Sequence, residues 1–219
     1  MSKIINEGKR IEAKSFEIIG GLLKKKGIDL SGPRKAVITR VIHTSVDLGY
    51  AGDLVFSPGA IEAGLRAIRQ GKNIVVDSSM VKAGINKNIA ARFKNKIICR
   101  IHDKDVIKKS GELNLTRAIV AMRKSQRETE GGIIAIGNAP TALFEVCDLV
   151  KSGKVEAALI IGVPVGFVGA AESKRMLRSL KIPYITNKSR KGGSTVAAAI
   201  VNALLILARE KGVKKENSR

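Results

Sequence analysis

His43 is the residue best suited to acid–base chemistry in this sequence, because an imidazole exchanges protons near neutral pH without help from its surroundings. It is one of two histidines, and it stands between an apolar run and the polar pair Thr44-Ser45. The alternative is a structural histidine bound to a backbone carbonyl. We expect His102, in the charged segment IHDKD, to be solvated. One residue is therefore the candidate for proton transfer.

Three glycine-containing segments could bind anions. Gly137–Thr141 (GNAPT) precedes an expected helix, so its N–H groups could receive an anionic group; alternatively, Asn138 only caps that helix. Lys191–Thr195 (KGGST) could form a basic anion nest, although Walker A spacing is missing. Gly162–Ala170 departs from a dinucleotide fingerprint, because Pro164 occupies the place of the second glycine. The sequence thus favours binding and proton transfer over phosphoryl transfer.

The charge balance points to an anionic partner. The 219 residues carry 40 Lys or Arg against 19 Asp or Glu, a formal net charge of +21, which attracts nucleic acid or a small molecule with several carboxylates or phosphates. The alternative is a generally basic solvated surface. Aromatic residues at 3% and the absence of Trp argue against stacking on nucleic-acid bases. We therefore expect no nucleic-acid partner.

Other classes of protein are disfavoured. Cys99 and Cys147 form no metal-binding or disulfide pattern, and no GxSxG motif indicates a serine nucleophile. The first residues do not resemble a signal peptide, and the longest charge-free apolar stretches are shorter than a membrane-spanning helix of about 20 residues. We expect a soluble, cytoplasmic protein with no membrane partner and no metal site of its own.

Buried apolar runs alternate with helical patterns along the chain, which is typical of βαβ units. The sequence predicts an α/β protein, a three-layer α/β/α single domain spanning residues 1–219 with a mainly parallel sheet. Strands are expected at 36–43, 73–77, 97–101, 132–137, 157–162 and 183–186. Helices are expected at 9–26, 57–70 with Ser57 as N-cap, 115–127, 140–150, 170–180 and 194–211, with a charged loop at 102–109 and a basic tail at 211–219.

Ligands of such folds bind at the carboxyl ends of the strands. The expected site therefore lies among the loops that begin at His43, Asp77, Gly137 and Gly162. In an ideal strand, side chains three residues apart face opposite sides. For Arg40 and His43, either the first strand ends before His43 or Arg40 reaches around an edge, and we expect the first.

Eight motifs, in order along almost the whole chain, resemble the precorrin-8X methylmutase family. They are SFEII (15–19), RVIHTS (40–45), DLVFSPGAIEAGLRAI (53–68), VVDSSMVKAGI (75–85), TRAIVAMR (116–123), GNAPTALFEV (137–146), GVPVGFVGAAESK (162–174) and GGSTVAAAIVNAL (192–204). Each motif is weak alone, whereas their order and spacing are highly specific.

The resemblance implies an isomerase that moves a methyl group from C-11 to C-12 of a polycarboxylate tetrapyrrole. It implies no organic cofactor, so any cobalt would be carried in the substrate ring. It also implies a homodimer with the pocket near the subunit interface. A corrinoid carrier without turnover is the alternative, and an RNA-binding protein is a third possibility.

The resemblance also assigns roles to residues. His43 matches the family's catalytic histidine, which is thought to give a proton to the macrocycle. Arg40, in the same RVIH motif, matches a substrate-contacting arginine. The expected substrate contacts are Ser15, Arg40, Thr44, Met80, Arg117 and Asn138. The cations among them suit a flat ring edged by carboxylates.

Overall fold

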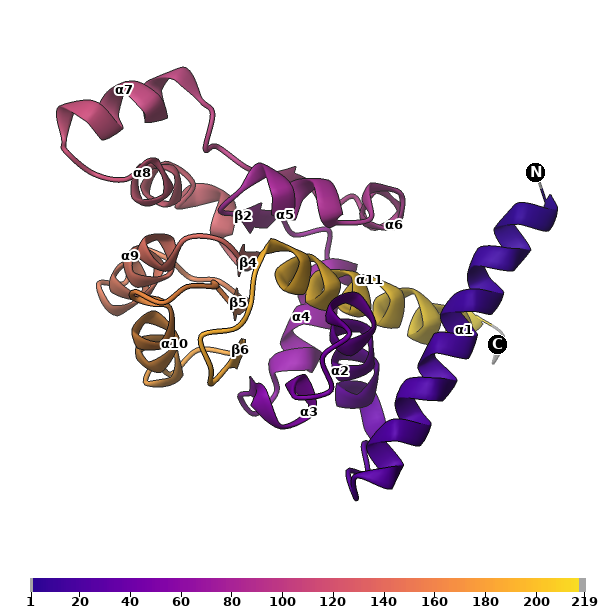
Figure 1. Cartoon of the computed structure of the whole chain (residues 1–219). Coiled ribbons are helices and arrows are strands. Elements are labelled where there is room, and N and C mark those ends of the chain that lie inside the picture. The colour runs from indigo at the N-terminus through magenta and orange to yellow at the C-terminus, as the bar shows by residue number, and fades with distance from the viewer. Residues whose placement is uncertain (1, 217–219) are drawn as a thin grey trace.

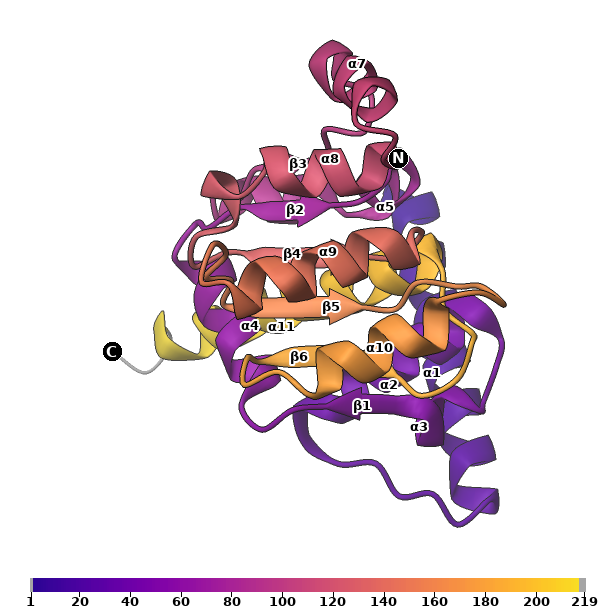
Figure 2. The same ribbon diagram turned by 90° about the vertical axis from the view of Figure 1, so that its left-hand side faces the viewer.

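A six-stranded sheet forms the centre of the fold, in the order β1-β6-β5-β4-β2-β3 (Figure 2). The computed structural model describes residues 2–216. The strands are β1 (Leu54–Phe56), β2 (Ile74–Val76), β3 (Ile97–Ile98), β4 (Ile133–Ile136), β5 (Leu159–Gly162) and β6 (Tyr184–Asn187). β1 pairs antiparallel with β6 at one edge, and the remaining neighbours are parallel. The predicted mainly parallel sheet is confirmed.

Helices cover both faces of the sheet, which confirms the three-layer α/β/α architecture. They are α1 (Ser2–Lys25), α2 (Gly32–Ser45), α3 (Tyr50–Asp53), α4 (Ala60–Arg69), α5 (Ser79–Gly84), α6 (Lys87–Arg92), α7 (Lys104–Glu112), α8 (Arg117–Lys124), α9 (Pro140–Lys151), α10 (Ala170–Arg178) and α11 (Ser194–Glu216), with a 3-10 turn at Arg127–Thr129. α8, α9 and α10 lie on one face, and α4 and α11 on the other (Figure 1). α2 packs against α11, and α1 lies outside α2.

Side chains of the central strands alternate between two cores, because successive residues of a strand point to opposite faces. In β4, Ile133 and Ala135 join the core beneath α4 and α11, whereas Ile134 and Ile136 join the core beneath α8 and α9. Burial on both faces explains why these strands are continuous apolar runs. The sheet is therefore a firm base for the loops at its carboxyl edge.

The segment 36–43 is helical, so the prediction of a strand there is wrong. Four of its five apolar residues are at most 4% exposed, namely Val37, Ile38, Val41 and Ile42. They recur at i, i+1, i+4 and i+5, which places them on one face of a helix. Burial of that face, which packs against α11, outweighs the strand preference of the individual β-branched residues.

Two further expectations differ from the structure. The segment 102–109 is not a loop throughout, because α7 begins at Lys104, directly after an N-cap aspartate. Ser57 is not the N-cap of a helix: Gly59 precedes α4, and the Ser57 Oγ accepts a hydrogen bond from the backbone N–H of Tyr184 at 2.8 Å. That contact joins the end of β1 to β6. Strand β1 itself was not predicted.

The terminal helices extend beyond their expected limits. α1 begins at Ser2 rather than near residue 9, and α11 continues to Glu216 through most of the expected tail at 211–219. Residues 217–219 lie outside the described part of the chain. Among residues 2–216, no helix combines the length and apolar character needed to cross a membrane.

Candidate active site

His43 and Ser15 form a hydrogen-bonded pair between α2 and α1. The Ser15 Oγ and the His43 Nδ1 lie 2.8 Å apart, and the contact is partly buried. His43 is in the last turn of α2, not at the end of a strand. Either atom can donate, depending on the tautomer. Because Ser15 engages Nδ1, Nε2 is the ring nitrogen that can exchange a proton with a ligand.

Arg40 lies on the same side of α2 as His43, since residues three apart in a helix are neighbours. In a strand these two side chains would face opposite sides, whereas in this helix they lie on the same side. The Arg40 Nη1 donates to the Glu12 Oε1 at 2.9 Å, and its guanidinium carbon lies 5.2 Å from the Phe16 ring centre. The Phe16 ring meets the His43 ring edge to face, with centres 5.4 Å apart. Sequence reasoning missed Glu12 and Phe16, although their spacing around Ser15 is helical.

A cleft of about 700 Å³ opens beside His43, between α1 and the end of α2. Its apolar lining includes Ile11, Ile18, Leu22 and Val46, and its cations are Arg10 and Lys14. These four apolar side chains are 41–90% exposed, so the cleft is an open apolar surface bordered by positive charge. Such a surface suits a ligand with apolar faces and anionic edges.

The GNAPT loop is organised by Asp77, which follows β2. The Asp77 carboxylate accepts the backbone N–H groups of Gly137, Asn138 and Ala139 at 3.0, 2.8 and 2.7 Å. Asp77 is 1% exposed, and this burial raises its pKa although the three hydrogen bonds lower it. These three N–H groups, which the sequence offered to an anion, are thus already bound. Asn138 is not the N-cap of α9, because that position is Ala139.

Known proteins resemble this chain over nearly its whole length. A family model described as Precorrin-8X methylmutase matches residues 10–207. A Cobalt-precorrin-8 methylmutase of Priestia megaterium is 47% identical, with 95% of this chain and 92% of that protein aligned. A Precorrin-8X methylmutase of Pseudomonas aeruginosa is 41% identical, with 93% and 98% aligned. The chain belongs to the precorrin-8X methylmutase family.

A solved structure supports the same assignment. The precorrin-8X methylmutase of Thermus thermophilus superposes with a TM-score of 0.85 at 35% identity, over 93% of this chain and 98% of that chain. A Cobalt-precorrin-8 methylmutase of Methanocaldococcus jannaschii is 40% identical over 96% of this chain and 99% of that protein. As a member of this family, the protein is an isomerase, a methylmutase of cobalamin biosynthesis, as the motifs indicated.

The residues expected to contact the methylmutase substrate fall into two groups. Ser15, Arg40 and Thr44 lie around His43 at the junction of α1 and α2, where the Thr44 hydroxyl donates to the Arg40 carbonyl at 2.9 Å. Of these three residues, only Ser15 lines the described cleft, whereas Arg40 lines a neighbouring pocket with Glu12 and Phe16. The second group lines neither. It comprises Met80 on α5, Arg117 at the start of α8 and Asn138 in the loop after β4, all exposed.

The KGGST segment is also engaged within the protein. The Gly193 N–H donates to the Val163 carbonyl at 2.9 Å, and the Lys191 Nζ donates to the Asp47 Oδ2 at 2.7 Å. These contacts place the chain that leaves α2 beside the end of β5. The cleft itself is lined by α1, the end of α2 and the segment that follows it. Of the four loops among which the sequence predicted the site, only the one that begins at His43 contributes to this lining.

Metal-binding side chains do not gather in the part of the chain that the structure describes: no group of three His, Cys, Asp or Glu is placed to hold an ion. Burial raises the pKa of the Cys147 thiol to about 12, so this cysteine is a thiol at neutral pH. That the enzyme needs no cofactor of its own stays a prediction.

Proposed function

We propose that this methylmutase moves the methyl group of cobalt-precorrin-8 from C-11 to C-12, giving the corrin acid. The cobalt form is favoured because the relatives from Priestia megaterium and Methanocaldococcus jannaschii, 47% and 40% identical, are both named for it. The Pseudomonas aeruginosa relative, 41% identical, is named for precorrin-8X. The cobalt ion enters as part of the substrate.

His43 is the proton-transfer residue of the proposal, and the 2.8 Å contact between Ser15 Oγ and His43 Nδ1 carries it. With Nδ1–H donating to Ser15, the imidazolium form of His43 can give its Nε2 proton to the macrocycle, and the resulting neutral imidazole can take a proton back at Nε2 without a change of ring orientation. A methyl shift within one ring system needs the correct tautomer and conformation to be held, and one acid–base group can bias that protonation state. The Phe16 ring, packed edge to face with the imidazole, limits rotation of the His43 side chain.

The open cleft supports a flat, polycarboxylate substrate. A tetrapyrrole presents apolar faces to Ile11, Ile18 and Val46, while its edge carboxylates lie within reach of the cations Arg10 and Lys14. Arg40 is paired with Glu12, so it is available to a substrate carboxylate only by exchanging that partner. These features fit the net charge of +21.

A homodimer is part of the proposal. Ile11, Ile18 and Leu22 are 62%, 52% and 41% exposed on α1, and their spacing of seven and four places them on one helix face. A second copy of the chain packed along this face would enclose the cleft, so that the bound ring would lie between the two copies. Light scattering should give about twice the 23.4 kDa chain mass, and Ile18→Glu should shift the enzyme towards monomer. A monomeric wild-type enzyme would contradict the proposed homodimer.

We also place the enzyme in the cytoplasm.

The deciding assay is anaerobic absorbance spectroscopy of the enzyme with cobalt-precorrin-8 and, separately, with precorrin-8. The proposal predicts the corrin spectrum with both rings and a higher kcat/KM for the cobalt form. Faster turnover of precorrin-8 would overturn the substrate assignment. Binding of either ring without a change towards the corrin spectrum would identify a carrier instead.

A further inference from the structure

We propose that Lys191, held in place by the buried Lys174, is a positioning residue that fixes the end of α2 and thereby the His43 side chain. The inference rests on the proposed proton-transfer role of His43, because a fixed ring matters only if that ring acts on the substrate. It assigns a task to two lysines that make no contact with the cleft.

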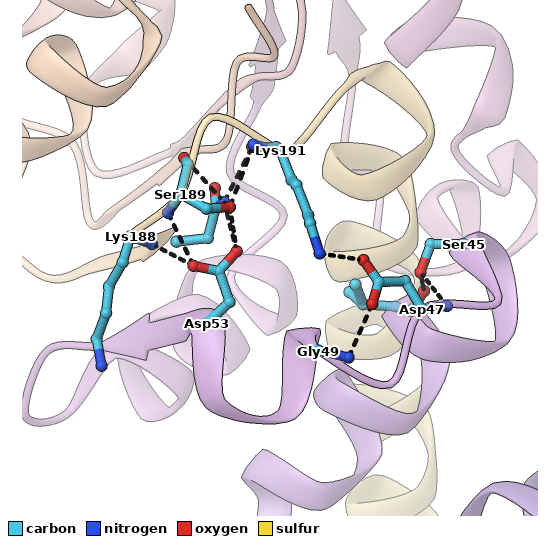
Figure 3. Close-up of polar contacts among 9 residues, drawn as sticks. Ser45, Asp47, Gly49, Asp53, Lys188, Ser189 and Lys191 are labelled. Atoms are coloured by element: carbon cyan, nitrogen blue, oxygen red, sulfur yellow. Dashed lines mark hydrogen bonds and ion pairs between the residues drawn. The ribbon is translucent and has the colours of Figure 1, made fainter.

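Lys191 ties the chain leaving α2 to the loop after β6. Its Nζ donates to the Asp47 Oδ2 at 2.7 Å, and the Asp47 Oδ1 accepts the Gly49 N–H at 2.8 Å (Figure 3). The ion pair with Lys191 lowers the pKa of Asp47. A side chain at Gly49 would begin 2.9 Å from the Asp47 carboxylate and 3.4 Å from the Lys191 Nζ. Asp47 is four residues after His43, so this contact fixes the end of its helix.

The loop that carries Lys191 is held from one side by Lys174 on α10. Lys174 is 0% exposed, and its Nζ donates to the carbonyls of Ser189 and Lys191 at 2.9 and 2.5 Å. The Asn187 Nδ2 donates to the same Lys191 carbonyl at 2.9 Å. Burying an ammonium group is unfavourable unless it is hydrogen-bonded. Here the Lys174 ammonium donates to the backbone and so holds the chain in place at Lys191.

Asp53 holds the loop from the other side and supplies the opposite charge. Its carboxylate accepts the backbone N–H groups of Lys188 and Ser189 at 2.9 and 2.8 Å, and the Ser189 hydroxyl at 2.6 Å (Figure 3). Burial raises its pKa, but the hydrogen bonds from Ser189 and Asn187 outweigh burial, so the net pKa is lowered. Asp53 therefore stays ionised, and its charge partly offsets the burial that lowers the pKa of Lys174 to about 8.

The next two residues join the loop to the sheet. A Cβ at Gly192 would lie 2.2 Å from the Val163 carbonyl oxygen, so only glycine allows this close approach. The following N–H, of Gly193, donates to the same carbonyl. A continuous set of contacts thus runs from the end of β5 through Lys191 to Asp47 and the last turn of α2.

Two conservative substitutions test the proposal, because the Lys191 and Asp47 side chains are 54% and 32% exposed and a partly exposed ion pair contributes little to global stability. In Lys191→Met and Asp47→Asn, we expect kcat to fall about 10-fold through misplacement of His43, with KM and the thermal midpoint nearly unchanged. Lys191→Arg, which keeps a cation for Asp47, should restore most of kcat. Lys188→Met is the matched control, because the Lys188 Nζ contacts only the Gly52 carbonyl, at 3.5 Å, among the described residues.

Imidazole NMR gives a readout that does not depend on catalysis. The chain has two histidines, so the His43 signal is assigned with His102→Ala, and the His102 signal serves as internal reference. The His43 signal should shift or broaden in Lys191→Met, Asp47→Asn and, where it folds, Lys174→Met, but not in Lys188→Met.

Distinct outcomes would overturn the positioning role. Wild-type kcat and an unchanged His43 signal in Lys191→Met and Asp47→Asn would show that the pair does not position His43. A raised KM with normal kcat would make Lys191 a substrate contact instead. If His43→Ala retained full activity, the proton-transfer proposal would fail, while the NMR signal would still decide whether Lys191 orders the end of α2.

Discussion

Replacing Ser15 with Ala tests how His43 is prepared for catalysis. The substitution removes one hydroxyl on α1 and leaves the α1–α2 packing through Phe16 in place. Without an acceptor for Nδ1–H, the imidazole loses the hydrogen bond that selects its tautomer and orientation. We expect kcat to fall, with little effect on unfolding because Ser15 is only partly buried.

The size of the effect follows from the geometry. The 2.8 Å contact is an ordinary hydrogen bond, and such bonds contribute about 0.5–1.5 kcal/mol net. At about 1.4 kcal/mol for each tenfold change in rate, Ser15→Ala should lower kcat by about 2- to 10-fold. Removal of a general acid–base group costs about 10²- to 10⁴-fold, so His43→Ala should be far more damaging.

A double-mutant cycle separates a role through His43 from an independent one. Single-turnover rates with the tetrapyrrole substrate are measured for wild type, Ser15→Ala, His43→Ala and the double variant. Because Ser15 acts through the imidazole, it should have almost no effect once His43 is Ala, and Ser15→Thr should retain most of the rate. Equal losses from Ser15→Ala in both backgrounds would refute this reasoning.

Three further predictions concern the framework of the site. Asp77→Asn, which puts an amide against three backbone N–H groups, should lower the free energy of unfolding by about 1–3 kcal/mol; an unchanged denaturant midpoint would contradict this. Gly192→Ala should cost about 3 kcal/mol, because its Cβ would overlap the Val163 carbonyl; wild-type stability would show that the loop moves away freely. Burial lowers the pKa of Lys174 from 10.5 to about 8, with Asp53 opposing this and Arg178 adding to it. Between these values the unfolded chain binds more protons than the folded one, so the unfolding free energy of wild type relative to Lys174→Met should rise with pH, by about 2 kcal/mol from pH 8 to pH 10. If urea titrations show that this difference in unfolding free energy stays constant or falls over the same pH range, the lowered pKa of Lys174 is contradicted.

The central strands could be predicted from sequence because both of their faces are buried. The runs 73–77, 132–137 and 157–162 contain β2, β4 and β5, and nothing but an apolar run fits a strand covered on both sides. The short strand β1 has only three residues at an antiparallel edge, too few for a periodic pattern. Its pairing with β6 depends on residues far along the chain.

The site was harder to predict because its parts meet only in three dimensions. The segment 36–43 resembles a strand because most of its apolar residues are β-branched. The spacing of Val37 and Val41, which pack towards α11, is instead that of a helix. The sequence drew attention to the GNAPT loop, but the placement of Asp77 against it depends on β2 lying next to β4. Likewise, no local pattern links Asp47 to Lys191, which are 144 residues apart.

The most direct test of the account is the single-turnover rate of His43→Ala with cobalt-precorrin-8 under anaerobic conditions, beside His102→Ala. The account predicts a loss of about 10²-fold or more in the formation of the corrin spectrum for His43→Ala, with ring binding retained and with His102→Ala like wild type. A His43→Ala enzyme that forms the corrin at the wild-type rate would contradict the assignment of the proton-transfer step to this residue.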